Sequence, residues 1–207
     1  MLLRVLLAAA SYLIGSFSLS ITISKLLPGG DVRRHGSGNA GATNMARVYG
    51  MLPGLLTLAG DMLKCVLVML VGHWLAGDRG MALCGAACLT GHCFPVFYHF
   101  KGGKGVSVGA AMGFVVDWRV GVCMAIVFFA FALVSKKVSL GSCAGALMFF
   151  AACIWFGMSE PIVIMSAYTM SLVVVKHREN LRRVARGTEP DFKVASKAPK
   201  APPEPGK

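Results

Sequence analysis

Long apolar segments separated by short polar stretches dominate the chain. They cover roughly residues 3–27, 52–75, 80–98, 105–117, 119–135, 139–157 and 159–175. None shows the alternation of apolar and polar residues that indicates strands, and most are long enough for a helix to cross a bilayer. The pattern therefore predicts an all-α integral membrane protein with about seven transmembrane helices.

Two segments leave alternatives open. Segment 105–117 is shorter than the roughly 17 residues that a perpendicular helix needs to cross a bilayer, so a half-span and a count of five or six spans remain alternatives. The first segment follows Arg4 and contains AAAS, as a cleaved signal peptide would. Its apolar run continues to Leu27, beyond the roughly 7–15 residues of a signal peptide's apolar region, which favours a permanent first helix.

The composition also indicates a membrane protein. The 207 residues have a mean hydropathy of +0.66 and only 14% charged side chains, which is too apolar for a soluble domain of this length. The cysteines all fall in or beside apolar segments and are expected to be small buried side chains. Cys84 and Cys88 lie one helical turn apart, but no further pair completes a metal site, so neither a metal nor another cofactor is expected.

Positive charge is concentrated in one set of alternate loops. Under the positive-inside rule this places the N-terminus outside and the C-terminus in the cytoplasm, as an odd number of spans requires. The net charge of +12 therefore needs no nucleic acid to explain it. The basic loops hold Arg33, Arg34, Arg47, Lys101, Lys104, Lys136, Lys137 and the residues from Lys176 onward, whereas the opposite loops hold Arg79 and Arg119, each near an acid.

The chain changes character after Gly187. Residues 188–207 are rich in Pro and Lys and poor in apolar side chains, a composition typical of disorder. We therefore expect one transmembrane domain at residues 1–187, followed by a disordered, basic, Pro-rich cytoplasmic tail at residues 188–207.

The first polar cluster is HGSGNAGATNMAR, residues 35–47. A loop with glycines and short polar side chains at this density can turn many N–H groups toward an oxyanion, and an arginine supplies charge. An ordinary Gly/Ser/Asn loop is the alternative, but the density of hydrogen-bonding groups favours a binding site. Its candidate ligand-binding residues are Ser37, Gly38, Asn39, Gly41, Ala42, Thr43, Asn44 and Arg47.

The second cluster is GHCFPVFYHFKGGKGVS, residues 91–107, which lacks the Walker spacing because Gly105 follows the second lysine. A helix N-terminus beside two lysines is nevertheless an anion site. Lysines that reach out of the membrane edge are the alternative. The glycines, which uncover the backbone, favour anion binding by Lys101, Gly102, Gly103, Lys104 and Gly105.

Two further clusters have equally good structural explanations. In GDMLKC, residues 60–65, Asp61 and Lys64 share one helix face, so they either form a structural ion pair or contact substrate. In SKKVSLGS, residues 135–142, Ser142 lies at the start of a span and either caps that helix or contacts a ligand.

The last polar cluster, KHRENLRR at residues 176–183, follows the last span. His177 and Asn180 lie three residues apart and share one helix face, which favours a functional pair over a solvated interface histidine. HWLAGD, residues 73–78, has the H-x-x-x-x-D spacing of many acyltransferases. The charge pattern places it outside, across the bilayer from the other clusters, so we interpret it as an interface segment.

In chain order, SGNAGATN with Arg47, GDMLK, GHCFPVFYHFKGGKGVS, SLGS, and KHRENLRR followed by RGTEP make the chain resemble the bacterial acyl-phosphate–glycerol-3-phosphate acyltransferase family. These integral enzymes of the bacterial inner membrane begin phospholipid synthesis. The resemblance implies transfer of an acyl group from a fatty acyl phosphate to the primary hydroxyl of glycerol 3-phosphate, which yields lysophosphatidate and phosphate. It implies no cofactor, and the soluble enzyme that makes acyl phosphate is an expected partner.

The resemblance also assigns roles to residues. It implies that glycerol 3-phosphate is bound by Ser37, Arg47 and the catalytic set Lys104, Ser142, His177 and Asn180, and that Gly41 to Asn44 hold the acyl-phosphate head. Deprotonation by the substrate's own phosphate is the expected mechanism, with His177 as general base the rival. The chain has Cys65 where the family usually has glycine, which affects only how closely that helix packs.

Two other classes of function fit the sequence less well. A transporter of phosphorylated solutes would also need basic loops, but transporters place polar groups near the membrane midplane and often contain internal repeats. Beyond Asp61 and Lys64 the chain has few polar groups at depth, and no repeat is visible. A lipid-surface binding protein without catalysis would not need a cluster as elaborate as residues 36–47.

Overall fold

The computed structural model describes residues 1–194, and this part contains helices and no strand, which confirms the all-α prediction. Each of the seven apolar segments contains helix. The α-helices are α1 (Leu2–Ser16), α2 (Leu19–Lys25), α3 (Ala42–Tyr49), α4 (Met51–Cys93), α5 (Val106–Val116), α6 (Trp118–Ser135), α7 (Val138–Trp155), α8 (Glu160–Lys176) and α9 (Arg178–Ala185). Two short 3₁₀ helices are η1 (Val32–Arg34) and η2 (Val96–Tyr98).

Helix α4 is a hairpin of two apolar arms, residues 51–75 and 78–93. The backbone leaves helical geometry at Ala76 and at Gly77, whose φ of 59° and ψ of −152° suit glycine. Gly72 in the first arm packs against the backbone of Gly80 in the second, because small residues let helices approach closely. The two arms occupy two of the predicted segments.

Within residues 1–194, four stretches are long and apolar enough to cross a membrane by length and composition: Leu2–Lys25, Met51–Tyr98, Trp118–Ser135 and Val138–Trp155. The second includes both arms of α4. Helix α5 has 11 residues, so it is short, as its segment predicted. The chain is therefore a multi-pass membrane protein in which α5 is too short for an ordinary span.

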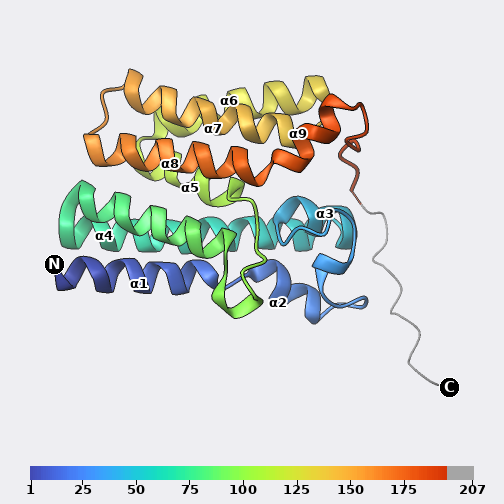
Figure 1. Ribbon diagram of the computed structural model, residues 1–207, viewed down its shortest axis with the longest axis horizontal. Coiled ribbons are helices and arrows are strands. Elements are labelled where there is room, and N and C mark those ends of the chain that lie inside the picture. Colours follow the sequence, from blue (N-terminus) through green and yellow to red (C-terminus); the bar gives the residue numbers. More distant parts are fainter. Residues whose placement is uncertain (195–207) are drawn as a thin grey trace.

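The helices form two groups with α5 between them (Figure 1). Helices α1, α2 and α3 pack against α4, whereas α6 packs against α7 and α7 against α8. Both groups contribute to one core, which includes Met69, Leu89, Met112 and Phe149. Helices α3 and α9 lie at the same end of the molecule, far from the N-terminus (Figure 1).

The structure differs from expectation in the stretch 35–47, which we expected to be a loop. Helix α3 begins at Ala42, within this stretch, and Gly41 is its N-cap. The helix forms because Met45, Val48 and Tyr49 share a face that packs on Val32. Half of the predicted loop is therefore the first turns of a helix.

Candidate active site

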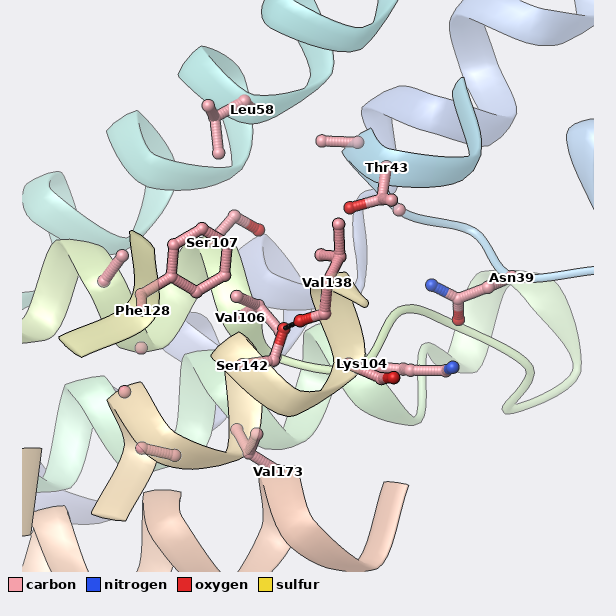
Figure 2. Close-up of a pocket in the computed structure, with 18 of the residues that line it drawn as sticks. Asn39, Thr43, Leu58, Lys104, Val106, Ser107, Phe128, Val138, Ser142 and Val173 are labelled. Atoms are coloured by element: carbon pink, nitrogen blue, oxygen red, sulfur yellow. Dashed lines mark hydrogen bonds between the residues drawn. The ribbon is translucent and has the colours of Figure 1, made fainter. Parts of the chain in front are cut away.

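A cavity of roughly 400 Å³ lies between the two groups of helices. One part of its wall is apolar and comes from α4, α5 and α6, including Leu58, Phe114 and Phe128. The other part is polar and lies toward Asn39 and Lys104 (Figure 2). The cavity can therefore hold a ligand with an apolar tail and an anionic head.

The polar part of the cavity is built from the N-termini of four helices. A helix N-terminus carries unpaired N–H groups and partial positive charge, so it attracts anions. At α9 this charge is offset, because its N-cap His177 is also the C-cap of α8. The convergence of the α3, α5 and α7 N-termini therefore favours a negatively charged ligand before any side chain is counted. The lining residues at these ends are Gly41 to Asn44 on α3, Gly105 to Ser107 on α5, Val138, Ser139 and Ser142 on α7, and His177 and Asn180 on α9.

Lys104 and Arg47 bring positive side chains to the same cavity. Lys104 Nζ donates a hydrogen bond to Asn180 Oδ1. The ion pairs within residues 1–194 use other cations, such as Lys64, Lys137 and Arg183, so neither Lys104 nor Arg47 has a carboxylate partner there. Burial lowers the pKa of Lys104 to about 8. A phosphate would supply the missing counter-charge.

Asn44 holds the loop before α3 in place. Its Nδ2 donates to the carbonyl oxygens of Val32, His35 and Asn39, and its Oδ1 accepts from the Ser37 amide at 2.9 Å. A Cβ at Gly36 would collide with this Oδ1. The side chain of Asn44 is thus fully used within the protein. Of the residues that the sequence proposes for ligand binding in this stretch, Gly38 does not line the cavity, and the others do: Ser37, Asn39, Gly41, Ala42, Thr43, Asn44 and Arg47.

His177 and Ser142 face the cavity with free acceptor sites. His177 Nδ1 lies 2.8 Å from the carbonyl oxygen of Val173, which fixes the hydrogen on Nδ1 and leaves Nε2 as an acceptor. Burial lowers the pKa of His177 to about 4, so the ring is neutral at pH 7. Ser142 Oγ donates to the Val138 carbonyl at 2.8 Å (Figure 2). Both groups can accept a hydrogen bond from a substrate hydroxyl.

Glu189 is a cavity residue that sequence reasoning missed. It is 8% exposed, and its Oε1 accepts from Asn180 Nδ2 at 2.7 Å and from Ser139 Oγ at 3.1 Å. Its Oε2 accepts from Arg183 Nε at 2.8 Å. Burial raises its pKa, but these hydrogen bonds lower it by more, so the pKa lies below its usual value. Glu189 therefore holds Asn180, the partner of Lys104, in position.

The chain around Glu189 lies against the turn between α6 and α7. The Phe192 amide donates to the Lys136 carbonyl at 3.2 Å, and Lys137 Nζ lies 2.7 Å from Asp191 Oδ1. Residues 188–194, which belong to the segment expected to be a disordered tail, thus contact the transmembrane domain, while residues 195–207 lie outside the described part. The motif RGTEP was the available signal for this extension.

Lys101, Gly102 and Gly103, which the sequence also proposes for substrate binding, lie outside this cavity. Lys101 and Gly102 line a second pocket, together with Gly38. The Gly103 amide donates to the His92 carbonyl at 3.0 Å, and a Cβ on Gly102 or Gly103 would collide with His92. These two glycines are therefore needed for packing against His92, and Lys104 and Gly105 are the cavity residues of this motif.

Asp61 and Lys64 form a buried structural cluster. Lys64 Nζ lies 2.8 Å from Asp61 Oδ1 and donates to the carbonyl oxygens of Gly15 and Phe17 at 3.0 and 2.9 Å. These two carbonyls lie at the break between α1 and α2, which explains why the first segment is not one continuous helix. Asp61 and Lys64 do not line the cavity, so the geometry favours the structural explanation.

The chain matches the family described as glycerol-3-phosphate acyltransferase over residues 5–187. The chain belongs to this family. The glycerol-3-phosphate acyltransferase of Thermoanaerobacter sp. (strain X514) is 37% identical over 185 residues, which cover 89% of this chain and 93% of that one. The Bacillus velezensis (strain DSM 23117 / BGSC 10A6 / LMG 26770 / FZB42) enzyme is 35% identical over 192 residues, which cover 93% of this chain and 99% of that one.

Solved structures of PlsY (YgiH), an integral membrane glycerol 3-phosphate acyltransferase, share the fold. The glycerol 3-phosphate form superimposes with a TM-score of 0.88 at 33% identity, covering 92% of this chain and 96% of that chain. The lysophosphatidic acid form gives a TM-score of 0.85 at 32% identity, with 92% and 95% covered. The chain is therefore an enzyme, a membrane-embedded glycerol-3-phosphate acyltransferase of phospholipid biosynthesis.

Proposed function

We propose that the acyl donor is a fatty acyl phosphate and that the enzyme acylates the primary hydroxyl of glycerol 3-phosphate. The products are 1-acylglycerol 3-phosphate, that is lysophosphatidate, and inorganic phosphate. The observation that carries this proposal is one cavity in which Arg47 and Lys104 have no carboxylate partner among residues 1–194 and lie beside an apolar wall. Two phosphate groups and one acyl tail match its charge and its polarity.

Different parts of the cavity suit the two substrates. Lys104, Arg47 and Ser37 can bind the phosphate of glycerol 3-phosphate, while Ser142, His177 and Asn180 orient its glycerol hydroxyls. The N–H groups at Gly41 to Asn44 can hold the acyl-phosphate head, and the apolar wall near Phe128 can hold the start of the acyl chain. Both reacting groups would then meet at the boundary between the polar and apolar walls.

The reaction needs no covalent enzyme intermediate. The primary hydroxyl oxygen attacks the carbonyl carbon of the mixed anhydride, the bond from that carbon to the phosphate oxygen breaks, and the hydroxyl proton passes to the departing phosphate. Lys104, Arg47 and the helix N-termini stabilise the negative charge. His177 is neutral, and its low pKa makes it a weak base, so it is better suited to orient the hydroxyl than to remove its proton.

For the topology we propose seven spans, with the N-terminus outside and the cavity facing the cytoplasm of a bacterial inner membrane. The basic loops surround the cavity end of the molecule. Three tryptophans are strongly exposed: Trp74 (83%), Trp118 (68%) and Trp155 (85%). Each lies on a helix that lines the cavity, at the end of that helix farther from the polar part of the cavity. Tryptophans gather at membrane interfaces, so they fit the outer surface. The soluble enzyme that makes acyl phosphate is the proposed partner on the cytoplasmic side.

The donor is tested with purified protein in detergent, glycerol 3-phosphate and palmitoyl phosphate. We expect equimolar release of phosphate and lysophosphatidate, and no product when palmitoyl-CoA replaces palmitoyl phosphate. Folded protein that makes no product from palmitoyl phosphate would refute the proposed donor, and equal rates with the thioester would replace it by acyl-CoA.

The proton route is tested with His177→Ala. Loss of an orienting hydrogen bond should lower kcat by about 10- to 100-fold. A loss of about four orders of magnitude with unchanged affinity for glycerol 3-phosphate would instead make His177 the general base.

A further inference from the structure

A second pocket of roughly 420 Å³ lies outside the acyltransferase cavity, and the proposed reaction makes no use of it. It is separated from the cavity by the loop before α3, in which Ser37 and Asn39 face the cavity and Gly38 faces the second pocket. Its lining is mostly polar and basic: Asp31, Arg33, Arg34, Gly38, His99, Lys101 and Gly102.

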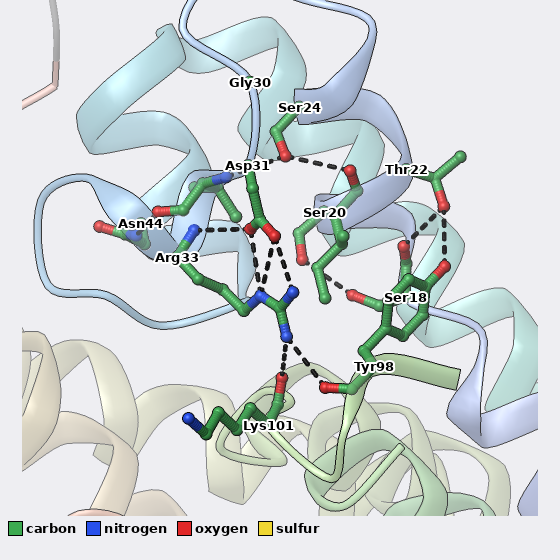
Figure 3. Close-up of polar contacts among 12 residues, drawn as sticks. Ser18, Ser20, Thr22, Ser24, Gly30, Asp31, Arg33, Asn44, Tyr98 and Lys101 are labelled. Carbon is green, nitrogen blue, oxygen red and sulfur yellow. Dashed lines mark hydrogen bonds and ion pairs between the residues drawn. The ribbon is translucent and has the colours of Figure 1, made fainter. Parts of the chain in front are cut away.

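Arg33 joins the two walls of this pocket. Its guanidinium pairs with the Asp31 carboxylate at 2.7 Å, and its Nη1 donates to the carbonyl oxygens of Tyr98 and Lys101 at 3.0 and 3.2 Å (Figure 3). Between these carbonyls, His99 and Phe100 have φ angles of 56° and 58°, which are costly for residues with a Cβ. The turn that carries Lys101 is thus held in a fixed shape by contacts on both sides.

Positive charge in this pocket exceeds negative charge. Among the described lining residues Asp31 is the one acid, and it forms an ion pair with Arg33. Burial raises the pKa of Asp31, but the Arg33 guanidinium lowers it by more, so the pKa lies below its usual value. Arg34 and Lys101 take no part in the ion pairs of the described residues. Some basic side chains on this side of the molecule have acidic partners, as Lys137 has in Asp191, and the unpaired Lys104 and Arg47 face the acyltransferase cavity. The positive-inside rule explains the number of basic residues but not why two unpaired ones face one concave surface.

The surroundings place the pocket at the membrane interface. Phe97 and Phe100 flank it in the chain and are each 58% exposed, and exposed aromatic side chains are typical of the lipid head-group region. Lys25, at the end of α2, lies 5.9 Å from the centre of the Tyr98 ring. A ligand in this pocket would therefore lie at the depth of lipid phosphates, one loop away from the acyltransferase cavity.

We propose that this pocket is a second oxyanion site, separate from the acyltransferase cavity, which binds a phosphate group through Arg34 and Lys101. The phosphate belongs either to the head group of an anionic phospholipid or to free inorganic phosphate. Gly38 lies in the same loop as Ser37 and Asn39, which line the catalytic cavity. A phosphate bound in the second pocket would therefore reduce the mobility of one wall of that cavity. This inference does not depend on the identity of the acyl donor.

Site-specific lysine labelling tests the proposal. The full-length protein is acetylated with an amine-reactive ester, and mass spectrometry gives the labelling rates of Lys101 and of Lys136, an exposed lysine at the α6–α7 turn that serves as internal control. Micelles receive inorganic phosphate or sodium chloride of equal ionic strength. Nanodiscs contain phosphatidylcholine alone or with phosphatidylglycerol.

Ligand at ten times its Kd should slow labelling of Lys101 by about tenfold and leave Lys136 unchanged. Arg34→Gln should abolish this protection, and Arg34→Lys should keep part of it. Protection by phosphate in micelles identifies free phosphate as a ligand, and protection by phosphatidylglycerol alone identifies the lipid head group. If Lys101 is slowed no more than Lys136 in every condition, or if Arg34→Gln is protected as well as the parent, there is no such site.

Discussion

Lys64 and Lys104 are both lysines within an apolar protein, yet their ammonium groups meet different partners. Lys64 Nζ lies 2.8 Å from a carboxylate oxygen of Asp61 and donates to two backbone carbonyls. Lys104 Nζ donates to the neutral amide oxygen of Asn180, and the nearest acid of its network, Glu189, is bonded to Asn180. One lysine is neutralised within the fold, whereas the other has no charge partner in the described part of the chain.

This difference separates a structural cluster from a binding site. A compensated buried pair has little to gain from a ligand, because an anion would have to displace the carboxylate. An uncompensated lysine costs stability until an anion arrives, so part of the binding free energy of a phosphate comes from relieving that cost. We therefore expect Lys64 to affect folding and Lys104 to affect catalysis.

The largest effect is expected for Lys104→Met. Removing one partner of a buried, hydrogen-bonded charge pair costs about 2–5 kcal/mol, so kcat/KM for glycerol 3-phosphate should fall by about 10²- to 10³-fold. The thermal midpoint in detergent should stay the same or rise. Phosphate release and a melting curve on one preparation check both statements. A lowered thermal midpoint with retained activity would show that Lys104 contributes to folding and not to catalysis.

Lys64→Met is expected to act on stability instead. It leaves the Asp61 carboxylate buried without its counter-charge, which costs about 3–5 kcal/mol of unfolding free energy. The double variant Asp61→Leu/Lys64→Met removes both charges and should regain part of this loss, although the Gly15 and Phe17 carbonyls still lack their donor. Denaturation in mixed micelles measures the free energies. Specific activity of the folded double variant near that of the parent is expected, and a hundredfold lower activity would place the pair in the chemistry.

Glu189→Gln tests the residue that positions Asn180. The amide keeps the shape but weakens charge-assisted hydrogen bonds that are each worth about 1.5–3 kcal/mol, so kcat should fall by about 10-fold or somewhat more. The KM for glycerol 3-phosphate should change less, because Lys104 still carries its charge. Steady-state kinetics separate the two constants, with Asp191→Asn as a control acid on the same segment. Equal losses in both variants would indicate a general structural effect.

The smallest effect is a pH dependence. Lys104 has a pKa of about 8, whereas glycerol 3-phosphate is already a dianion there, because phosphate monoesters have a second pKa near 6. Above pH 8 the lysine loses its proton, so KM for glycerol 3-phosphate should rise by about tenfold per pH unit. Lys104→Arg should remove this rise, since arginine stays charged. A rise that persists in Lys104→Arg would assign it to another group.

Much of the fold could be predicted from the chain because apolar length and periodicity are local properties. All seven apolar segments contain helix, and the short segment 105–117 is a short helix. The break between α1 and α2 could not be predicted, since it depends on Lys64, which lies far along the chain and bonds to the Gly15 and Phe17 carbonyls.

The site shows the same limit. The residues that the motifs propose as a catalytic set line one cavity: Lys104, Ser142, His177 and Asn180. Lys101 looks equivalent to Lys104 in sequence, but packing of the glycines on His92 directs it to another pocket. Glu189 was missed because the composition after Gly187 indicates disorder, and only its tertiary contacts with α7 and α9 connect it to the cavity.

The most direct test of the account is equilibrium binding of radiolabelled glycerol 3-phosphate to purified Lys104→Met and to Asp61→Leu/Lys64→Met, beside the parent enzyme. We predict that the first variant binds about 10²- to 10³-fold more weakly and that the folded double variant binds within about threefold of the parent. Undiminished binding by Lys104→Met, or equal losses in the two variants, would contradict the claim that Lys104 holds the substrate phosphate while Lys64 holds the fold.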